Sequence, residues 1–513
     1  MGLYDFGFYD LIERNAVSFG SRPAWFEVDD QRTSTFAQYK NKVDQLACGM
    51  QNAGIIKGDR IGVLGKNSLD FFCLYGAAAA LGAIVLPINW RLSLEEVLFN
   101  LNDCEPTMLF VDSEYQEMIG DSKDKLPSVR DCYSMKSPEG AFPGFDTLLQ
   151  NGGEFQPADV SADDGLVIIH TAAVAGRPRG ALLSHGNLIC ANMQISLQLN
   201  LCADDVHLNI LPLFHVGGLF MASGSFHAGA LNVNMSKFDA AQAVSFIEEK
   251  NVSVMFDFSP ILGSILEEHK QSGKSIQSLQ HVAGLESPAV IEEYQELTGG
   301  TFICLYGQTE TSAVATMGRY ADRPGSAGQT IPLANVRIVD DNDKPLPAGE
   351  IGEIAVKGPV VFKGYWNLPE DTAQAFHGDW HHTGDLGRFD ADGFLWYEGR
   401  KAEKELIKPG GENVYPAEVE KVILEHPAIE KTVVFGVPDP KWKEGIKAVC
   451  QLKAGQTLEP RELITFVGTR IASFKKPQYV EFASELPQLE DGSADRAKVK
   501  ELYGGEQGSI LLP

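Results

Sequence analysis

Four short segments of this sequence combine residue types that can bind phosphate, ribose or a metal ion. The first, residues 171–180, carries glycines and two arginines directly after the apolar, strand-like run 166–169. Backbone N–H groups and guanidinium groups in such a loop can hold oxyanions. The segment does not have the spacing of a Walker loop, and an ordinary surface loop is the alternative interpretation.

The second segment, residues 306–311, reads Tyr-Gly-Gln-Thr-Glu-Thr and follows the strand-like run 302–305. Open α/β folds bind ligands at the carboxyl ends of parallel strands, so polar residues at this point are candidates for a site. Glu310 can hold a magnesium ion, and Thr309 can donate a hydrogen bond to a phosphate. A simple helix cap is the alternative.

The third segment, residues 380–387, contains Asp385, whose carboxylate can accept two hydrogen bonds from a ribose diol. His381 and His382 stand side by side in it. Neighbouring residues of a strand point to opposite faces, so this pair does not itself make a metal site, and we expect a solvated loop.

The fourth segment, residues 410–420, opens with two glycines before a proline that favours a helix start. Gly410 and Gly411 permit a close approach of the backbone to a ligand. A plain turn before a helix is the alternative.

The elements that must position these segments predict an α/β fold. Apolar runs rich in β-branched residues (60–64, 83–86, 107–111) alternate with helical patterns. This order is typical of parallel sheets with helices on both faces. From about residue 325 the pattern changes to hairpins, which predicts a β-rich subdomain. A compact α+β pattern follows, and we predict an N-terminal domain of residues 1–402 and a C-terminal domain of residues 403–513.

Composition narrows the class of protein. The 513 residues allow about two to four domains. The 43 Lys and Arg against 69 Asp and Glu give a net charge of -26, which argues against a protein that coats nucleic acid or anionic lipid. Residues 71–88 are almost entirely apolar, and we interpret them as a buried helix and strand rather than a membrane span.

The cysteines and the N-terminus indicate a compartment. The eight cysteines are scattered without a CxxC pair, which fits a reducing environment and neither a zinc knuckle nor a disulfide framework. The first residues have no basic region before an apolar stretch, so no signal peptide is predicted. We therefore expect a cytoplasmic protein.

In their order, the four segments resemble the motifs of the adenylate-forming (ANL) superfamily, which includes acyl-CoA synthetases, peptide-synthetase adenylation domains and luciferases. The resemblance runs from Thr35 to Val499 and includes the connecting stretches 87–89, 211–215 and 364–366. It implies that ATP and a carboxylate form an acyl-adenylate and pyrophosphate. A small, mobile C-terminal domain then rotates, and a thiol attacks the mixed anhydride.

The resemblance assigns roles to particular residues. Phosphate binding falls to the loop 171–180, adenine binding to two segments, ribose binding to Asp385 and Arg400, and Mg²⁺ binding to Glu310. Thr309 touches the α-phosphate, and His215 stands between the acyl pocket and the adenylate. The loop residues concerned are Thr171, Gly176, Arg179 and Gly180. Those around the adenine are Gly284, Leu285, Glu286, Tyr306, Gly307 and Gln308. Those along the pantetheine tunnel are Gly410 and Gly411.

Three departures from the family pattern stand out. The loop centre, residues 172–175, lacks the usual hydroxyls, and Arg179 replaces a lysine. Ser493 stands where the family has its C-terminal catalytic lysine. The stretch 400–410 is about two residues longer than usual, which leaves Glu405 and Glu403 as alternative hinge residues. Side chains that could replace the missing lysine are Arg496, Lys498, Lys475 and Lys476.

The function predicted from these features is an AMP-forming acid–thiol ligase that uses ATP, Mg²⁺ and coenzyme A. The residues expected near its acyl pocket are mostly apolar, which favours a fatty, aromatic or alicyclic acid, although several can be plain core residues. They are Val216, Gly217, Gly218, Phe220, Phe256, Phe258 and Ser259. Two alternatives stay open: a ligase that loads a carrier protein, and a degenerate relative that binds nucleotide or acyl-CoA with little adenylation. The oligomeric state is open.

Overall fold

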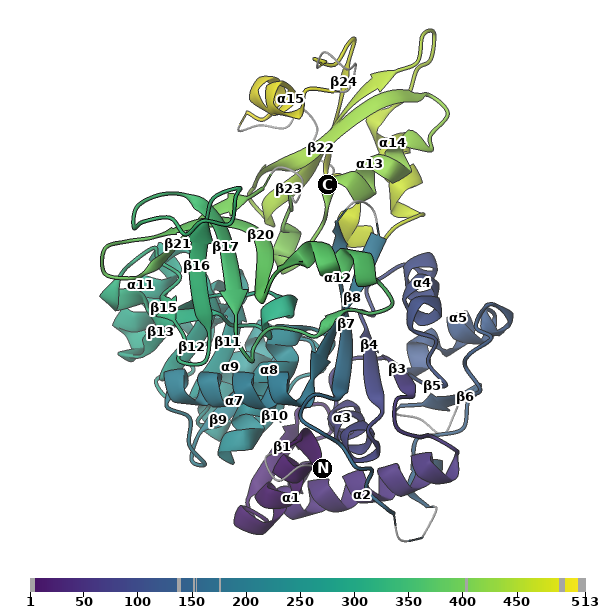
Figure 1. Cartoon of the computed structure of the whole chain (residues 1–513), viewed down its shortest axis with the longest axis vertical. Coiled ribbons are helices and arrows are strands. Elements are labelled where there is room, and N and C mark those ends of the chain that lie inside the picture. Colours follow the sequence, from purple (N-terminus) through teal and green to yellow (C-terminus); the bar gives the residue numbers. More distant parts are fainter. Residues whose placement is uncertain are drawn as a thin grey trace. The chain divides into compact units, whose positions relative to one another are not determined.

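The structure, a computed structural model, describes residues 5–135, 140–150, 153, 155–174, 177–401, 405–488 and 494–505 (Figure 1). Two compact units make up the chain. The first comprises residues 1–90, 101–170 and 180–399, and the second comprises residues 91–100, 171–179 and 400–513. The mixed α/β class predicted from the sequence is confirmed. The predicted boundary at 402/403 falls within residues outside the described ones.

A seven-stranded sheet has the order β18-β8-β7-β4-β3-β5-β6, and all of its strands except β18 come from residues 60–184. Its central pairs are parallel, as expected from the alternation of strands and helices. The strands are β3 (Arg60–Leu64), β4 (Ile84–Ile88), β5 (Met108–Val111), β6 (Asp131–Ser134), β7 (Gly165–Val174), β8 (Arg177–Ser184) and β18 (Gly364–Tyr365).

A nine-stranded sheet has the order β15-β14-β13-β12-β11-β9-β10-β1-β2. Its strands β9 to β13 are parallel neighbours, so their carboxyl ends share one edge. The strands are β1 (Pro23–Glu27), β2 (Thr33–Thr35), β9 (Val206–Asn209), β10 (Leu231–Asn234), β11 (Val254–Phe258), β12 (His281–Leu285), β13 (Thr301–Tyr306), β14 (Thr316–Arg319) and β15 (Gln329–Thr330).

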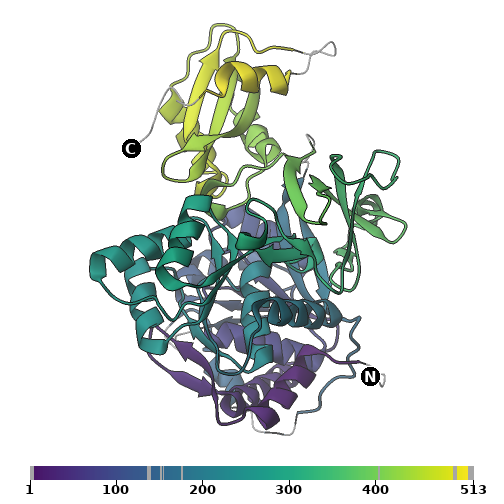
Figure 2. The same cartoon turned by 90° about the vertical axis from the view of Figure 1, so that its left-hand side faces the viewer.

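Helices cover these sheets (Figure 2). One hydrophobic core contains residues of both sheets together with residues of α3, α7 and α8. The helices of this region are α1 (Phe8–Ser18), α2 (Phe36–Asn52), α3 (Leu69–Leu81), α4 (Leu94–Cys104), α5 (Gln116–Gly120), α6 (Asp146–Leu149), α7 (His185–Leu199), α8 (Val216–Ala228), α9 (Ala240–Lys250), α10 (Ile261–Ser272), α11 (Pro288–Thr298) and α12 (Pro369–Ala375).

The apolar run 71–88 folds as the sequence predicted. It forms α3, nearly all of whose residues are buried, and the fully buried strand β4. Ser68 caps the helix by accepting a hydrogen bond from the Phe71 N–H, and Gly82 ends it at φ 65°. Among the described residues, no helix is long and apolar enough to cross a membrane.

The predicted β-rich subdomain is a five-stranded sheet in the first unit. It has the order β16-β17-β20-β19, with β21 paired to β20. The pairs β16–β17, β17–β20 and β19–β20 are antiparallel. The strands are β16 (Asn335–Val339), β17 (Gly352–Lys357), β19 (Phe376–His377), β20 (Trp380–Phe389) and β21 (Leu395–Arg400). Its hydrophobic cluster includes Tyr306, so the subdomain packs where β13 ends.

The second unit contains a three-stranded sheet of order β22-β23-β24 with its own core. Its elements are α13 (Pro416–Leu424), β22 (Ile429–Asp439), β23 (Lys443–Leu452), α14 (Pro460–Gly468), β24 (Tyr479–Ala483) and α15 (Arg496–Tyr503).

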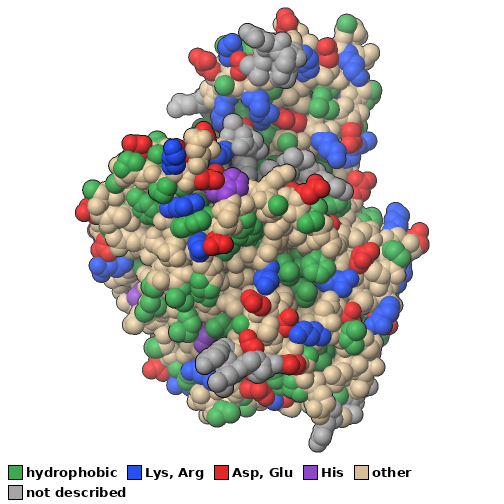
Figure 3. Space-filling view, in the orientation of Figure 1, with side chains coloured by type: hydrophobic (Ala, Val, Ile, Leu, Met, Phe, Trp, Pro, Cys, Tyr) green, Lys and Arg blue, Asp and Glu red, His purple; other side chains and the backbone are tan. Residues whose placement is uncertain are grey.

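Lys and Arg side chains are interspersed with Asp and Glu side chains over the face of the molecule shown in Figure 3.

Candidate active site

Asp385 is the centre of a hydrogen-bonded set in the first unit. Tyr306, the last residue of β13, donates its hydroxyl to Asp385 Oδ2 over 2.8 Å, and Gln308 Nε2 donates to the same oxygen over 2.5 Å. Gln308 Nε2 also lies 3.1 Å from the Thr383 carbonyl oxygen. Asp385 is buried. The structure thus brings together three residues that the sequence analysis assigned to adenine and ribose.

Gly307 makes the turn after β13 possible. A Cβ at this position would lie 2.0 Å from the Ala313 carbonyl oxygen, so no larger residue fits. The turn continues as the 3₁₀ helix η3 (Thr309–Thr311), where the Thr311 hydroxyl accepts a hydrogen bond from the Gln308 N–H over 2.8 Å. Thr309 and Glu310 therefore follow directly on the Asp385 set.

Glu310 has one carboxylate oxygen engaged and one available. The Tyr365 hydroxyl donates to Glu310 Oε1 over 2.8 Å, and the side chain is buried. Among the described residues, none donates a hydrogen bond to Oε2. The Phe362 N–H binds the Glu310 carbonyl oxygen over 2.9 Å and fixes the backbone. A buried carboxylate held on one side, with a second oxygen open, fits a hard divalent cation.

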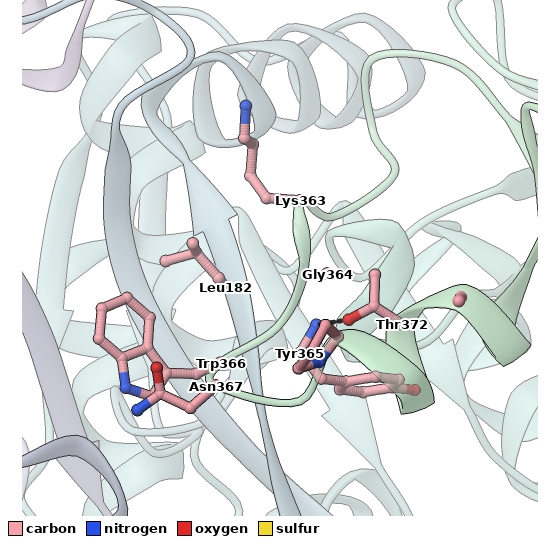
Figure 4. A pocket seen from close by; sticks show the side chains of 9 residues that line it. Leu182, Lys363, Gly364, Tyr365, Trp366, Asn367 and Thr372 are labelled. Atoms are coloured by element: carbon pink, nitrogen blue, oxygen red, sulfur yellow. Dashed lines mark hydrogen bonds between the residues drawn. The ribbon is translucent and has the colours of Figure 1, made fainter.

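Tyr365 was not assigned a role from the sequence, although it lies in the stretch 364–366 that carried part of the resemblance. It also lines a cavity of about 440 Å³ together with Trp366, Lys363 and Thr372 (Figure 4). The Thr372 hydroxyl accepts a hydrogen bond from the Tyr365 N–H over 2.9 Å. Tyr365 therefore connects Glu310 to the wall of this cavity.

Gly284, Leu285 and Glu286 lie at the carboxyl end of β12, next to β13. Gly284 has φ 156°, and a Cβ there would lie 1.8 Å from the Asp257 carbonyl oxygen of β11. Leu285 is 41% exposed. Since β12 and β13 are parallel, the two segments predicted to frame the adenine share one edge of the sheet.

His215 lies at the start of α8, where its Nδ1 accepts a hydrogen bond from the Gly217 N–H over 3.3 Å. Its ring faces the edge of Phe258 at a centroid distance of 6.4 Å, and Phe258 packs against Phe256 at 5.6 Å. A Cβ on Gly217 would lie 3.4 to 3.6 Å from all three side chains. These residues form an aromatic wall, whereas Phe220 is fully buried and belongs to the core.

The remaining predicted residues lie in the second unit or at its border. The Thr171 hydroxyl donates to the Arg179 carbonyl oxygen over 3.4 Å, and Arg400 Nη1 donates to the Tyr415 hydroxyl over 3.0 Å. Gly410 has φ 59° in the turn 409–411 with Gly411, and a Cβ there would lie 2.8 Å from the Trp442 ring. Gly180 is tightly packed against Ile168 in the first unit. Gly176 lies outside the described residues.

Three of the four side chains considered as substitutes for the family lysine form ion pairs within the second unit. Lys475 Nζ lies 2.5 Å from both Glu96 and Glu418. Arg496 binds Glu420 and Glu405. Lys498 is 3.4 Å from Asp495 in its own turn. Ser493 lies outside the described residues, as does the alternative hinge residue Glu403.

The expectation of a solvated loop at His381 and His382 is wrong. Both residues lie in β20 and are buried, His381 with 1% and His382 with 5% exposure. They do point to opposite faces, as strand geometry requires. His381 Nε2 lies 3.5 Å from Gln308 Oε1, whereas His382 Nδ1 lies 3.0 Å from Glu353 Oε2. The antiparallel pairing of β17 with β20 buries both rings.

The comparison with known families agrees with this fold and site. Residues 12–366 match the model of AMP-binding enzymes, and residues 418–492 match the C-terminal domain of AMP-binding enzymes. The chain therefore belongs to the AMP-binding, adenylate-forming enzyme family. Within that family it is an AMP-forming acid–CoA ligase, with a carboxylic acid, ATP and CoA as substrates.

Three relatives illustrate the similarity. An indoleacetate–CoA ligase of Aromatoleum aromaticum is 34% identical over 482 residues, which are 92% of this chain and 94% of the relative. A fatty acid–[acyl-carrier-protein] ligase of Streptomyces coeruleorubidus is 30% identical over 500 residues, or 93% of this chain and 92% of that protein. A mutant o-succinylbenzoate CoA synthetase of Bacillus subtilis has a TM-score of 0.86 at 27% identity, covering 97% and 98% of the two chains.

Proposed function

We propose that this ligase activates an apolar monocarboxylic acid with an aromatic or fatty body. The observation that carries the adenylation step is the buried carboxylate of Asp385, which accepts hydrogen bonds from Tyr306 and Gln308. Thr309 and Glu310 follow Gln308 directly in the chain. This arrangement offers a buried carboxylate for a ribose diol and a second buried carboxylate for a cation. Gln308, which binds Asp385 of β20, lies two residues before Glu310 in the turn after β13.

The roles proposed for individual residues follow the family pattern. The substrate carboxylate attacks the α-phosphorus of ATP, the bond to pyrophosphate breaks, and the acyl-adenylate forms. Thr309 donates to the α-phosphate, and Arg179 with the loop 171–180 neutralises the other phosphates. Gly284, Leu285 and Glu286 frame the adenine opposite Tyr306. Arg400 assists Asp385 at the ribose.

Glu310 is proposed to hold Mg²⁺. Its Oε2 is open, while Tyr365 fixes Oε1, and carboxylate oxygen is the ligand type that Mg²⁺ prefers. The ion supplies charge neutralisation at the phosphates when it is bound. This chain contributes the fixed orientation of the carboxylate, because Tyr365 and the Phe362 N–H hold the side chain and the backbone of Glu310.

The aromatic wall of His215, Phe256 and Phe258 supports an apolar acyl group. Two phenylalanine rings in edge-to-face contact offer surface for a flat or aliphatic body. This chemistry also agrees with the indoleacetate–CoA ligase among the relatives, whose substrate has an aromatic body.

For the second half-reaction we propose that the CoA thiol sulfur attacks the acyl carbon, and AMP leaves. Gly410 and Gly411 are proposed to line the pantetheine tunnel, in a C-terminal domain of residues 403–513 that moves against residues 1–402. A carrier-protein thiol is the second candidate, because one relative is named a fatty acid–[acyl-carrier-protein] ligase.

All eight cysteines are free, which agrees with a reducing, cytoplasmic compartment.

Acid-dependent ATP–pyrophosphate exchange tests the proposal. We would measure exchange for a panel of fatty, aromatic and alicyclic acids, and then AMP release with CoA, with a pantetheinylated carrier protein and with neither. We expect exchange with at least one aromatic or fatty acid and CoA-dependent AMP release. Binding of ATP without exchange for any acid would indicate the degenerate relative instead.

A matched pair of variants tests the cation site. Glu310→Gln keeps the shape and removes the charge, and we expect exchange to fall about 100-fold or more, as for loss of a strong electrostatic contact in other enzymes. Glu398→Gln, at a surface carboxylate paired with Arg388, serves as the control. Equal Mg²⁺ dependence of the Glu310→Gln variant and the unaltered enzyme would remove Glu310 from the cation site.

A further inference from the structure

Two histidines and an aspartate from three parts of the β-rich subdomain converge on one point. Asp343 lies in the connection between β16 and β17, His377 in β19, and His382 in β20. One potential ligand atom from each residue lies within 4.8 Å of the others. None of these residues takes part in the proposed adenylation chemistry.

His382 presents a buried nitrogen to this point. Its Nδ1 lies 3.0 Å from Glu353 Oε2, and Glu353 Oε1 accepts a hydrogen bond from the Gly384 N–H over 2.7 Å. A carboxylate beside Nδ1 favours the tautomer with the proton on Nδ1, which leaves a lone pair on Nε2. That Nε2 atom is buried and has no hydrogen-bond partner among the described residues.

Asp343 and His377 complete the set. Asp343 Oδ1 lies 3.3 Å from His382 Nε2, and its Oδ2 lies 2.9 Å from His377 Nδ1. The two imidazole rings are 4.1 Å apart between centroids. An acceptor nitrogen and a carboxylate oxygen face each other across 3.3 Å, and a cation between them would satisfy both. The side chain of His377 is 52% exposed, so the point is open to solvent on one side.

We propose that Asp343, His377 and His382 bind a divalent transition-metal ion of the Zn²⁺ type. Two imidazole nitrogens and one carboxylate oxygen suit Zn²⁺, whereas Mg²⁺ and Ca²⁺ prefer oxygen ligands throughout. Glu353 acts as the outer partner that orients His382, an arrangement common behind zinc-bound histidines. Water would occupy the open position beside His377.

Such an ion would tie the 340–344 turn to the β19–β20 hairpin. Glu353 extends the connection, because it binds both His382 and the N–H of Gly384, the residue before Asp385. The site is therefore placed to stabilise the strand that carries Asp385. The proposal does not rest on the adenylation chemistry, and its test is a binding measurement.

The test is Zn²⁺ binding to the untagged full-length protein after removal of metal by a chelator. Zn²⁺ would be titrated in competition with a chromophoric chelator, in the absence of ATP. We expect one tightly bound ion in the unaltered protein. His377→Ala and Asp343→Asn should each weaken binding by at least about 10-fold, and Glu353→Gln by about 10- to 100-fold.

Two controls keep the outcome interpretable. Asp379→Asn alters an exposed carboxylate of the same hairpin that pairs with Lys357 and lies outside the cluster, so its Zn²⁺ affinity should not change. Cys104→Ala reports on the other three-residue set, Asp103, Cys104 and His170. Zn²⁺ should raise the melting temperature of the unaltered protein and of Asp379→Asn but not of His377→Ala.

The proposal fails if the unaltered protein and His377→Ala bind Zn²⁺ equally, or if neither binds it. It also fails if Cys104→Ala abolishes binding while His377→Ala leaves it intact. The His377 side chain is half exposed, so we expect His377→Ala to fold. Matching melting curves of the metal-free variant and the metal-free unaltered protein would show this. In each failing case Asp343, His377 and His382 form a polar His–Asp cluster without a metal.

Discussion

Tyr306 and Asp385 are separated by 79 residues, yet the Tyr306 hydroxyl donates a 2.8 Å hydrogen bond to Asp385 Oδ2. One residue ends a strand of the nine-stranded sheet, and the other lies in the β-rich subdomain. The bond therefore joins the two parts of the first unit at the proposed nucleotide site. Gln308 reinforces it with a second donor to the same oxygen.

The first prediction concerns Asp385. Asp385→Asn keeps the size of the side chain but removes the charge that would accept hydrogen bonds from a ribose. Hydrogen bonds to charged groups contribute about 1.5–3 kcal/mol, so we expect kcat/KM for ATP to fall about 10- to 100-fold in the exchange assay.

Tyr306→Phe is the matched control for Asp385→Asn. It preserves the carboxylate and the ring and removes one donor, so the loss should be smaller, about 10-fold or less. An unchanged KM for ATP in Asp385→Asn would contradict the assignment of Asp385 to the ribose.

The second prediction concerns the acyl wall. In Gly217→Val the added methyl groups point at Phe256, Phe258 and His215, because a Cβ there already lies within 3.6 Å of each. We expect kcat/KM for bulky aromatic acids to fall at least about 10-fold relative to short-chain acids, a typical discrimination for about one methylene of space.

The control for Gly217→Val is Gly120→Val, at an exposed position with no neighbouring atom within 4 Å. Its substrate profile should match that of the unaltered enzyme. If Gly217→Val instead lowers the rates for all acids by the same factor, the aromatic wall does not contact the acyl group.

The third prediction concerns the position of the missing lysine. Ser493→Lys restores the cation that the family uses between the carboxylate and the α-phosphate. Because this adds one hydrogen bond to a charged group, we expect the rate of adenylate formation to rise at least about 10-fold. The measurement is pre-steady-state formation of the acyl-adenylate without CoA. Ser484→Lys, at an exposed site, is the control for added charge.

An unchanged or lower rate in Ser493→Lys would favour a rearranged phosphate grip. In that case Arg179 is the residue to examine, since Arg179→Ala should then raise the KM for ATP. A variant with unaltered KM and rate would exclude Arg179 from the phosphate site.

The fourth prediction concerns the buried set of Lys475, Glu96 and Glu418 in the second unit. One ammonium faces two carboxylates at 2.5 Å. Burial raises the pKa of Glu418, and Lys475 only partly offsets it. Burial also opposes ionisation of Glu96, but the Lys475 ammonium and the hydrogen bonds from Ser93 together outweigh it and lower the pKa of Glu96. Lys475→Met would leave two buried carboxylates without their cationic partner, at a cost of about 3–5 kcal/mol in unfolding free energy.

Glu418→Gln is the informative partner of Lys475→Met. Because the folded-state pKa of Glu418 is raised, its ionisation costs stability as the pH rises above the ordinary value of 4.5. Relative to its value near pH 4, the stability of Glu418→Gln should therefore rise against that of the unaltered protein as the pH increases to neutral. Denaturant unfolding at the two pH values measures this, and a pH-independent difference would contradict the account.

Much of the fold was accessible from the sequence. The run 71–88 became α3 and β4, and the hairpin pattern after 325 became the antiparallel sheet, because local periodicity and turn residues decide such elements. The order of motifs also identified the family. The resemblance also implied that Tyr306, Gln308 and Asp385 serve one nucleotide, and the structure brings these three side chains together.

Other features depended on contacts between distant residues. The sequence analysis expected His381 and His382 in a solvated loop, but pairing of β17 with β20 buries both. Tyr365 reaches Glu310 across 55 residues, and Glu353 reaches His382 across 29. No local pattern encodes which partner a buried polar side chain finds.

The sequence by itself determined the class of elements and the family, and it supplied the residues proposed to carry adenylation. Only the tertiary structure decided which of those residues touch, that Lys475 is committed to Glu96 and Glu418, and that Asp343 lies between two histidines. The physical reason is that element formation depends on neighbours along the chain. A buried carboxylate or imidazole is instead satisfied by whichever group the packed sheets bring within about 3 Å.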